Sequence, residues 1–175
     1  MFVGHLLRFV CLVFVILPGL CLAEEFTGRV VGVTDGDTIT VLHNGVGEKI
    51  RLNGIDCPEK RQAFGQRAKQ FTSALVFSQE VMIVKHGRDK YGRTIGDVKL
   101  GDGTFVNREL VRVGLAWWYR KYTPGDQDLE RLESEARKAK RGLWIEPAPV
   151  PPWEFRHRQK IQRTEAHEAP AIRSY

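Results

Sequence analysis

The hydrophobic pattern of the chain changes its period several times, and each change predicts a new element. Short apolar runs separated by turn signals such as His43-Asn44-Gly45 predict strands. In contrast, Phe64, Ala68, Phe71 and Leu75 recur at spacings of four, three and four residues, which is the pattern of one helix face. The predicted strands are residues 26–33, 38–42, 48–55, 81–84 and 93–100, and the predicted helices are residues 64–77, 105–115 and 126–140.

This order of elements predicts one α+β domain over residues 24–144. Three strands, a helix, two strands and further helices suit a small five-stranded β-barrel, and barrels of this kind commonly bind oligonucleotides across one face. Because one fold hosts many activities, the function must come from the chemistry of particular residues.

The N-terminal segment, residues 1–23, has the pattern of a signal peptide. Arg8 precedes an unbroken apolar run over residues 9–17, and the segment ends in the small residue Ala23. An uncleaved membrane anchor is the weaker alternative, because the run is shorter than the roughly 20 residues of a spanning helix. We expect cleavage after Ala23, export to the periplasm or the medium, and no stable membrane insertion afterwards. Cys57 would then be the single thiol.

The C-terminal segment, residues 145–175, changes composition. It contains Pro147, Pro149, Pro151 and Pro152 and then mixed charges without apolar periodicity. This composition predicts an extended, largely disordered tail. A plain spacer and a polyproline ligand for a partner domain are the two interpretations.

The chain is basic, with a formal net charge of +6. A positive protein favours a polyanionic partner such as nucleic acid. The alternative is that the charge only aids solubility, so a site is needed to interpret it.

One short segment carries the residue types of phosphodiester chemistry. Asp56 has Arg51 five residues before it and Glu59 three residues after it. Carboxylates offer hard oxygen ligands to a cation, and arginine binds phosphate through its planar fork. Strict strand alternation would place Arg51 and Asp56 on opposite faces, so we expect a bulge at Gly54. Zinc is disfavoured because cysteines and histidines lack ligand spacing, whereas calcium and magnesium both stay open.

Two further segments interleave aromatic and cationic residues. In the loop 87–93, Tyr91 lies among three cations, and residues 117–122 combine two tryptophans and two tyrosines with Arg120 and Lys121. Such segments suit the stacking of single-stranded bases beside phosphates. A solvated loop and core packing are the alternatives. We expect one tryptophan to be buried and Tyr122 to lie near the site.

Four separated segments, residues 33–38, 51–59, 89–93 and 106–116, resemble the staphylococcal nuclease (thermonuclease) family in their order and approximate spacing. The resemblance extends from residue 26 to residue 144. It implies a five-stranded OB-fold barrel with three helices. It also implies a calcium cofactor and hydrolysis of DNA and RNA to 3′-phosphate ends. We expect a monomer.

The resemblance implies individual roles as well. Asp37 and Asp56 would be calcium ligands together with the backbone carbonyl of Cys57, a position at which the best-known member has threonine. The other roles are phosphate binding by Arg51 and Arg93, orientation or deprotonation of water by Glu59, and nucleotide contacts by Lys90, Tyr91 and Tyr122. The loop 59–64 is shorter than in that member, which would change the mobility of Glu59.

Two other functions compete with a nuclease. A binding module that has lost catalysis usually lacks one of the acids or arginines, whereas all five named acidic and arginine positions are occupied by competent residues here. A basic envelope protein would instead use its Pro-rich tail to bind a partner.

Overall fold

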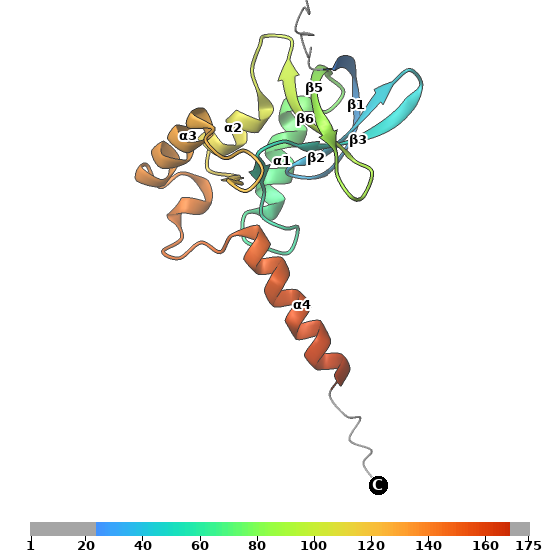
Figure 1. Cartoon of the computed structure of the whole chain (residues 1–175). Coiled ribbons are helices and arrows are strands. Elements are labelled where there is room, and N and C mark those ends of the chain that lie inside the picture. Colours follow the sequence, from blue (N-terminus) through green and yellow to red (C-terminus); the bar gives the residue numbers. More distant parts are fainter. Residues whose placement is uncertain (1–23, 169–175) are drawn as a thin grey trace, which may run out of the picture.

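Five strands close into a barrel that surrounds the apolar core of the protein (Figure 1). The computed structural model describes residues 24–168, so the predicted leader, residues 1–23, and the last residues, 169–175, lie outside the described residues. Neighbouring strands follow the order β1, β2, β3, β6 and β5 around the barrel. Their bounds are Glu25–Asp35 (β1), Thr38–His43 (β2), Val46–Leu52 (β3), Glu80–Arg88 (β5) and Thr94–Leu100 (β6).

Alternating burial explains why these segments form strands. Along β1, Phe26 and Val30 are buried in the barrel, whereas Thr27 and Arg29 between them are exposed. An extended chain turns successive side chains to opposite faces, so this pattern places one face inside and the other in solvent. The pairing of β3 with β6 is parallel, and the other strand pairs of the barrel are antiparallel.

Three helices lie at the positions that the apolar spacing predicts. They are α1 (Gly65–Val76), α2 (Val106–Arg112) and α3 (Gln127–Lys138). Helix α1 packs against β1, and α2 packs against α3 beside it (Figure 1). A 3-10 turn, η1 (Gly142–Ile145), follows α3. The predicted α+β class with a five-stranded barrel is confirmed.

A second, two-stranded sheet lies beside the barrel, formed by β4 (Ile55–Asp56) and β7 (Trp117–Trp118). Trp118 packs into the main core, whereas Trp117 packs into a smaller apolar cluster with Leu143 and Trp144. The prediction of a single buried tryptophan is wrong, because neighbouring side chains of β7 enter two different clusters and both are buried.

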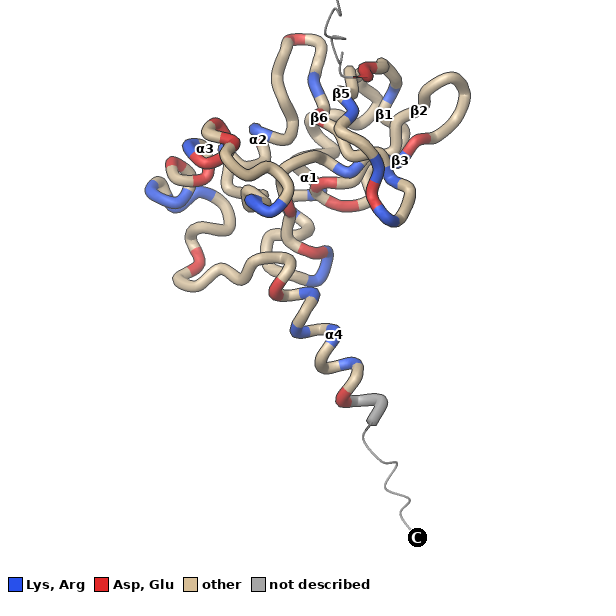
Figure 2. The backbone as a smooth tube through the Cα atoms, in the orientation of Figure 1, with Lys and Arg blue, Asp and Glu red and all other residues tan. Residues whose placement is uncertain are grey.

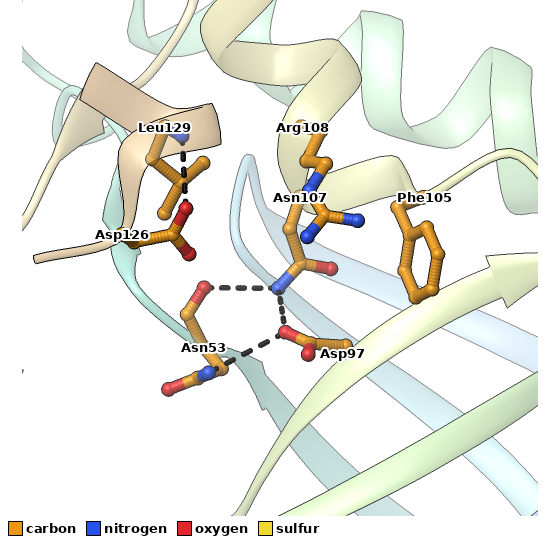
Figure 3. Close-up of a pocket in the computed structure, with 7 residues that line it drawn as sticks. All are labelled: Asn53, Asp97, Phe105, Asn107, Arg108, Asp126 and Leu129. Atoms are coloured by element: carbon orange, nitrogen blue, oxygen red, sulfur yellow. Dashed lines mark hydrogen bonds between the residues drawn. The ribbon is translucent and has the colours of Figure 1, made fainter. Parts of the chain in front are cut away.

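A tight turn, rather than a bulge within a strand, separates Arg51 from Asp56. Strand β3 ends at Leu52 and β4 begins at Ile55, and Gly54 between them has a φ of +71°, which favours glycine. The buried side chain of Asn107 in α2 fixes this turn, because its Nδ2 donates to the Asn53 carbonyl at 2.9 Å (Figure 3). The same Nδ2 lies 3.1 Å from Asp97 Oδ1.

A fourth helix, α4 (Pro152–Glu168), occupies most of the segment that was predicted to be disordered. It projects away from the barrel (Figure 1). Proline suits the first helical position, where its missing N–H needs no partner, and the carbonyl of Pro151 accepts bonds from the N–H groups of Glu154 and Phe155. The following residues contain no further Pro or Gly up to Glu168. The prediction of a disordered tail over residues 145–175 is therefore wrong for residues 152–168.

No helix within residues 24–168 combines the length and the apolar composition that a membrane span requires.

We predict that Gly54→Ala destabilises the protein more than Gly45→Ala does. Both glycines have similar positive φ values, +71° and +77°. A Cβ at Gly54 would meet Thr123 Oγ1 at 2.9 Å and Leu129 Cδ1 at 3.0 Å, whereas a Cβ at Gly45 would meet nothing within 4 Å. We expect Gly45→Ala to cost about 1 kcal/mol from the backbone alone and Gly54→Ala about 2–3 kcal/mol. Urea denaturation of both variants measures the difference, and equal losses would contradict this account of the turn.

Candidate active site

The guanidinium of Arg51 lies between two buried carboxylates. Its Nη1 is 3.0 Å from Asp37 Oδ2, and its Nη2 is 2.8 Å from Asp56 Oδ1. Asp37 is 6% exposed and Asp56 is 1% exposed. Burial of a carboxylate is costly unless a cation and hydrogen bonds compensate it, so Arg51 is required by both acids.

The barrel topology brings these three residues together. Thr38, directly after Asp37, pairs with Arg51 across β2 and β3, and the carbonyl of Asp37 accepts a bond from the N–H of Leu52. The turn at Gly54 then returns the chain so that Asp56 faces Arg51. The structure thus brings Arg51, Asp37 and Asp56 together, and their functional roles stay predictions.

Cys57 contributes its backbone N–H, which donates to Asp37 Oδ2 at 2.6 Å. Its thiol is buried beside Ala68 and Gly36, where a Cβ on the glycine would meet Cys57 Sγ at 2.9 Å. Burial, and after it the charge of Asp37, raises the pKa of the Cys57 thiol. The thiol is thus a packing group, and the role of the Cys57 carbonyl as a ligand stays a prediction.

A third aspartate, Asp35, borders the same cluster. Its Oδ1 accepts a bond from the N–H of Asp37 at 3.3 Å. Burial and the neighbouring Asp37 carboxylate raise the pKa of Asp35 to about 6. The pKa of Asp56 is also raised, chiefly by burial and further by Asp37, although hydrogen bonds from Arg156 and the charge of Arg51 oppose the shift. The sequence analysis missed Asp35 because Asp-Gly is such a common turn signal.

Arg93 reaches the cluster from the start of β6. The parallel pairing sets Thr94 beside Ile50, so Arg93 lies next to β3, and its Nη1 is 3.4 Å from the hydroxyl of Thr38. Asp89 holds Arg93 in place, because Asp89 Oδ2 accepts a bond from Arg93 Nε at 2.7 Å. Desolvation opposes the ionisation of Asp89, but hydrogen bonds from the side chain and backbone of Arg93 lower the pKa of Asp89 overall. Asp89 is a positioning residue that sequence reasoning left without a role.

Glu59 lies in a short loop that is firmly held. Its N–H donates to Gln62 Oε1 at 3.1 Å, and its carbonyl accepts a bond from the N–H of Gln62 at 2.8 Å. A Cβ on Gly65 would lie 2.0 Å from the same carbonyl, so the loop packs directly on the start of α1. The Glu59 carboxylate itself is 2.6 Å from Nη1 of Arg156 in α4. Sequence reasoning missed Arg156, because it assigned no structure to the tail.

The predicted nucleotide-binding residues form two aromatic groups. Tyr91 is 72% exposed, with Lys90 Nζ 5.0 Å and Arg93 Cζ 5.6 Å from its ring centroid. Tyr122 is exposed and meets Tyr119 edge to face, with ring centroids 4.8 Å apart. Tyr119, a member of the predicted aromatic segment 117–122, stacks on Trp153 at the start of α4. Desolvation, Tyr122 and then the Asp56 carboxylate raise the pKa of Tyr119.

The donor set fits a hard cation that keeps several water ligands. Within residues 24–168, no group of three or more His, Cys, Asp or Glu side chains is arranged to hold a metal ion alone. Asp37 and Asp56 nevertheless present carboxylate oxygens on either side of one guanidinium. Calcium and magnesium both accept carboxylates together with water, so this pair suits such an ion.

Comparison with known proteins places this geometry in a family. A family model described as staphylococcal nuclease homologue matches residues 49–146, more than half of the chain. The chain belongs to the staphylococcal nuclease family. It is 43% identical over 152 residues to an uncharacterized endonuclease of Escherichia coli, a match that covers 87% of this chain and 99% of the relative. It is 40% identical over 163 residues to a micrococcal nuclease of Shigella flexneri, covering 88% of this chain and 94% of the relative.

Membership of the staphylococcal nuclease family confirms the predicted family and the predicted enzyme class, a hydrolytic nuclease. Among the predicted site residues, Asp37 precedes the stretch that the staphylococcal nuclease family model matches. Its place in the site rests instead on its ion pair with Arg51.

We predict that Asp35→Asn stabilises the cation-free protein at neutral pH and not in acid. An aspartate with an unfolded pKa of about 3.9 and a higher folded pKa destabilises the fold as pH rises between these values. The folded value of about 6 sets the upper end of this window. Asparagine keeps the acceptor oxygen for the Asp37 N–H and removes the charge. In chelator, urea denaturation at pH 7 should show a gain of roughly 1–2 kcal/mol that disappears near pH 4. A gain that is independent of pH would contradict the charge as its cause.

Proposed function

We propose that this protein is a calcium-dependent phosphodiesterase that hydrolyses DNA and RNA, favours single strands and leaves 3′-phosphate ends. The observation that carries the proposal is the contact of Arg51 with both Asp37 and Asp56. This contact puts cation ligands and a phosphate-binding group next to each other.

Two arginines supply the positive charge that phosphodiester cleavage requires. Attack on phosphorus gathers negative charge on the equatorial oxygens, and groups that bind this charge better than the ground state accelerate the reaction. Arginine stays protonated and binds two oxygens at once. Among the described residues, the Arg51 guanidinium donates hydrogen bonds to the Leu52 carbonyl and to Asp56, and its contact with Asp37 is an ion pair. Because a guanidinium has five N–H donors, donors are left for a phosphate.

The cation would be held by Asp37 and Asp56, with water and a substrate oxygen completing its coordination. When bound, it would polarise a phosphate oxygen and offset charge in the transition state. The proximity of Asp35 favours a divalent ion further, because a third carboxylate adds negative potential to the site.

Glu59 is the residue that would orient or deprotonate the attacking water. Its carboxylate contacts the same guanidinium as Asp56, that of Arg156, and its side chain is 39% exposed, so part of it faces solvent. In this structure its Oε1 holds Arg156. Glu59 therefore becomes available to water when that ion pair opens.

The exposed ring of Tyr91 favours single-stranded substrates. Its flanking cations, Lys90 and Arg93, suit backbone phosphates, while the ring offers a face for a base. Bases of a duplex are stacked on one another, so this contact is available only to unpaired nucleotides.

We also propose that the protein acts after export, as a monomer. The pattern of residues 1–23 supports the export. Intact-mass measurement of protein recovered from the periplasm or the culture medium should give a chain that begins at Glu24. Full-length chain confined to the membrane fraction would contradict export.

We predict that Glu59→Gln and Arg51→Lys lose cleavage while retaining the fold. Removal of a catalytic base typically costs about 10²–10⁴ in rate, and loss of one charge-stabilising donor costs about 10²–10³. Lysine keeps a positive charge between the two buried acids but lacks the planar guanidinium, so Arg51→Lys tests two-oxygen binding of phosphate rather than the charge. The control is Glu130→Gln, an exposed acid on α3, which should cleave like wild type.

The measurement is cleavage of single-stranded DNA and RNA with calcium, with magnesium and with a chelator. The 5′ ends of the products should accept a phosphate label without prior dephosphorylation, as expected when the phosphate stays on the 3′ side. Binding of DNA without cleavage under any divalent cation would show that the protein is not an active nuclease. Undiminished cleavage by Arg51→Lys would overturn the role of the Arg51 guanidinium in binding phosphate.

A further inference from the structure

A second arginine, from the C-terminal helix, contacts the acidic cluster. Arg156 Nη2 lies 2.7 Å from Asp56 Oδ2, and Arg156 Nη1 lies 2.6 Å from Glu59 Oε1 and 3.3 Å from Asp56 Oδ1. Both oxygens of Asp56 are therefore hydrogen-bonded to guanidinium groups, Oδ1 to Arg51 and Oδ2 to Arg156. Arg156 joins the predicted cation ligand to the predicted catalytic acid.

The start of α4 is docked, which positions Arg156. The ring of Trp153 stacks on Tyr119 with centroids 4.9 Å apart and planes 8° apart, and it meets Trp117 edge to face at 5.8 Å. Just before the helix, the carbonyl of Val150 accepts a bond from Gln62 Nε2 at 2.5 Å. Gln62 belongs to the Glu59 loop, so the tail is tied to the same loop that carries the catalytic acid. The contact of Arg156 thus rests on an anchored helix turn.

The rest of α4 is different. Basic residues recur along its projecting length, and Arg158, the next arginine, pairs with Glu154 of its own helix at 3.6 Å (Figure 2). Arg158 provides the natural comparison, because it carries the same charge on the same helix without a contact to the cluster.

Charge explains why an arginine is held here. Hydrogen bonds and ion pairs link four carboxylates in this cluster, those of Asp35, Asp37, Asp56 and Glu59, whereas Arg51 carries only one positive charge. Desolvation would lower the pKa of Arg156, but Asp56 and Glu59 raise it overall, so the guanidinium is fully charged and bound through its charge. A guanidinium and a metal ion compete when they use the same carboxylate oxygens.

We propose that Arg156 is an internal counter-ion that occupies Asp56 and Glu59 in the cation-free protein and is displaced when a divalent cation binds. The inference rests on the proposed function, because it takes Asp56 to be a cation ligand. Arg156 therefore weakens cation binding and stabilises the empty site. Displacement of Arg156 also frees the Glu59 carboxylate to contact water. Binding of the cation and availability of Glu59 are therefore coupled.

The test compares Arg156→Gln with Arg158→Gln in the exported form, residues 24–175. Calcium binding is measured by titration calorimetry without substrate, and thermal unfolding is measured in chelator and in saturating calcium. Glutamine keeps the length and polarity of the side chain and removes the charge. We expect Arg156→Gln to bind calcium about five- to tenfold more tightly, a size consistent with loss of one partly exposed charged hydrogen-bond pair. Arg158→Gln should bind within about twofold of wild type, because surface charges contribute little.

The unfolding measurement gives the second readout. In chelator, Arg156→Gln should melt at a lower temperature than wild type, and this difference should shrink in saturating calcium, where both proteins have lost the contact. Arg156→Lys, which keeps the charge without the fork, should fall between wild type and Arg156→Gln in calcium affinity.

Equal calcium affinities for wild type and Arg156→Gln would overturn the counter-ion role while leaving the proposed nuclease intact. Weaker calcium binding by Arg156→Gln would also overturn the counter-ion role. Unchanged calcium binding with lost cleavage would overturn it as well and would make Arg156 a substrate-binding residue instead. Failure of the proposed function looks different, since wild type would then bind no calcium and cleave no nucleic acid.

Discussion

Two buried carboxylates beside each other require a cation between them, and Arg51 provides it for Asp37 and Asp56. Removal of one partner from a buried ion pair typically costs about 3–5 kcal/mol, because the remaining charge is left without water or a counter-charge. Apolar side chains of similar volume would often stabilise a core as well or better. These three residues therefore contribute little to the free energy of folding compared with apolar side chains. Their arrangement suits the proposed function instead, in which the site binds phosphate and a cation.

The surrounding backbone keeps these three residues in register. The turn at Gly54 reverses the chain between Arg51 and Asp56, and Asn107 satisfies the carbonyl of Asn53 inside that turn. Close packing restricts the backbone beside Asp37 as well, because a Cβ on Gly36 would lie only 2.7 Å from the Cβ of Ala68. A polar side chain buried as deeply as Asn107 is stable only with its hydrogen bonds made, so the network favours one arrangement of the site over alternatives.

The sequence predicted those helices and strands whose buried residues repeat at a regular spacing. The strands and helix α1, which carries Ala68, Phe71 and Leu75, follow from side-chain periodicity, since one buried face leaves a repeat in the sequence. The meeting of Arg51 with Asp56 was expected only because the chemistry of their segment requires it, since strand alternation opposes it. Helix α4 was missed because the prolines that lead up to it favour an extended chain equally well, and the helix itself begins with only one of them, Pro152. No periodicity relates Arg156 to Asp56, which are 100 residues apart.

The two arginines of the cluster differ in burial, and that difference sets their roles. Arg51 is 16% exposed and is enclosed between strands, so the loss of its contacts would leave buried acids unpaired. Arg156 is 43% exposed, and its guanidinium can return to water at little cost. A divalent ion with two charges therefore competes with Arg156 far more easily than with Arg51. The site holds a permanent counter-ion from the barrel and an exchangeable one from the tail, and the exchangeable one keeps the empty site ordered without closing it to a cation.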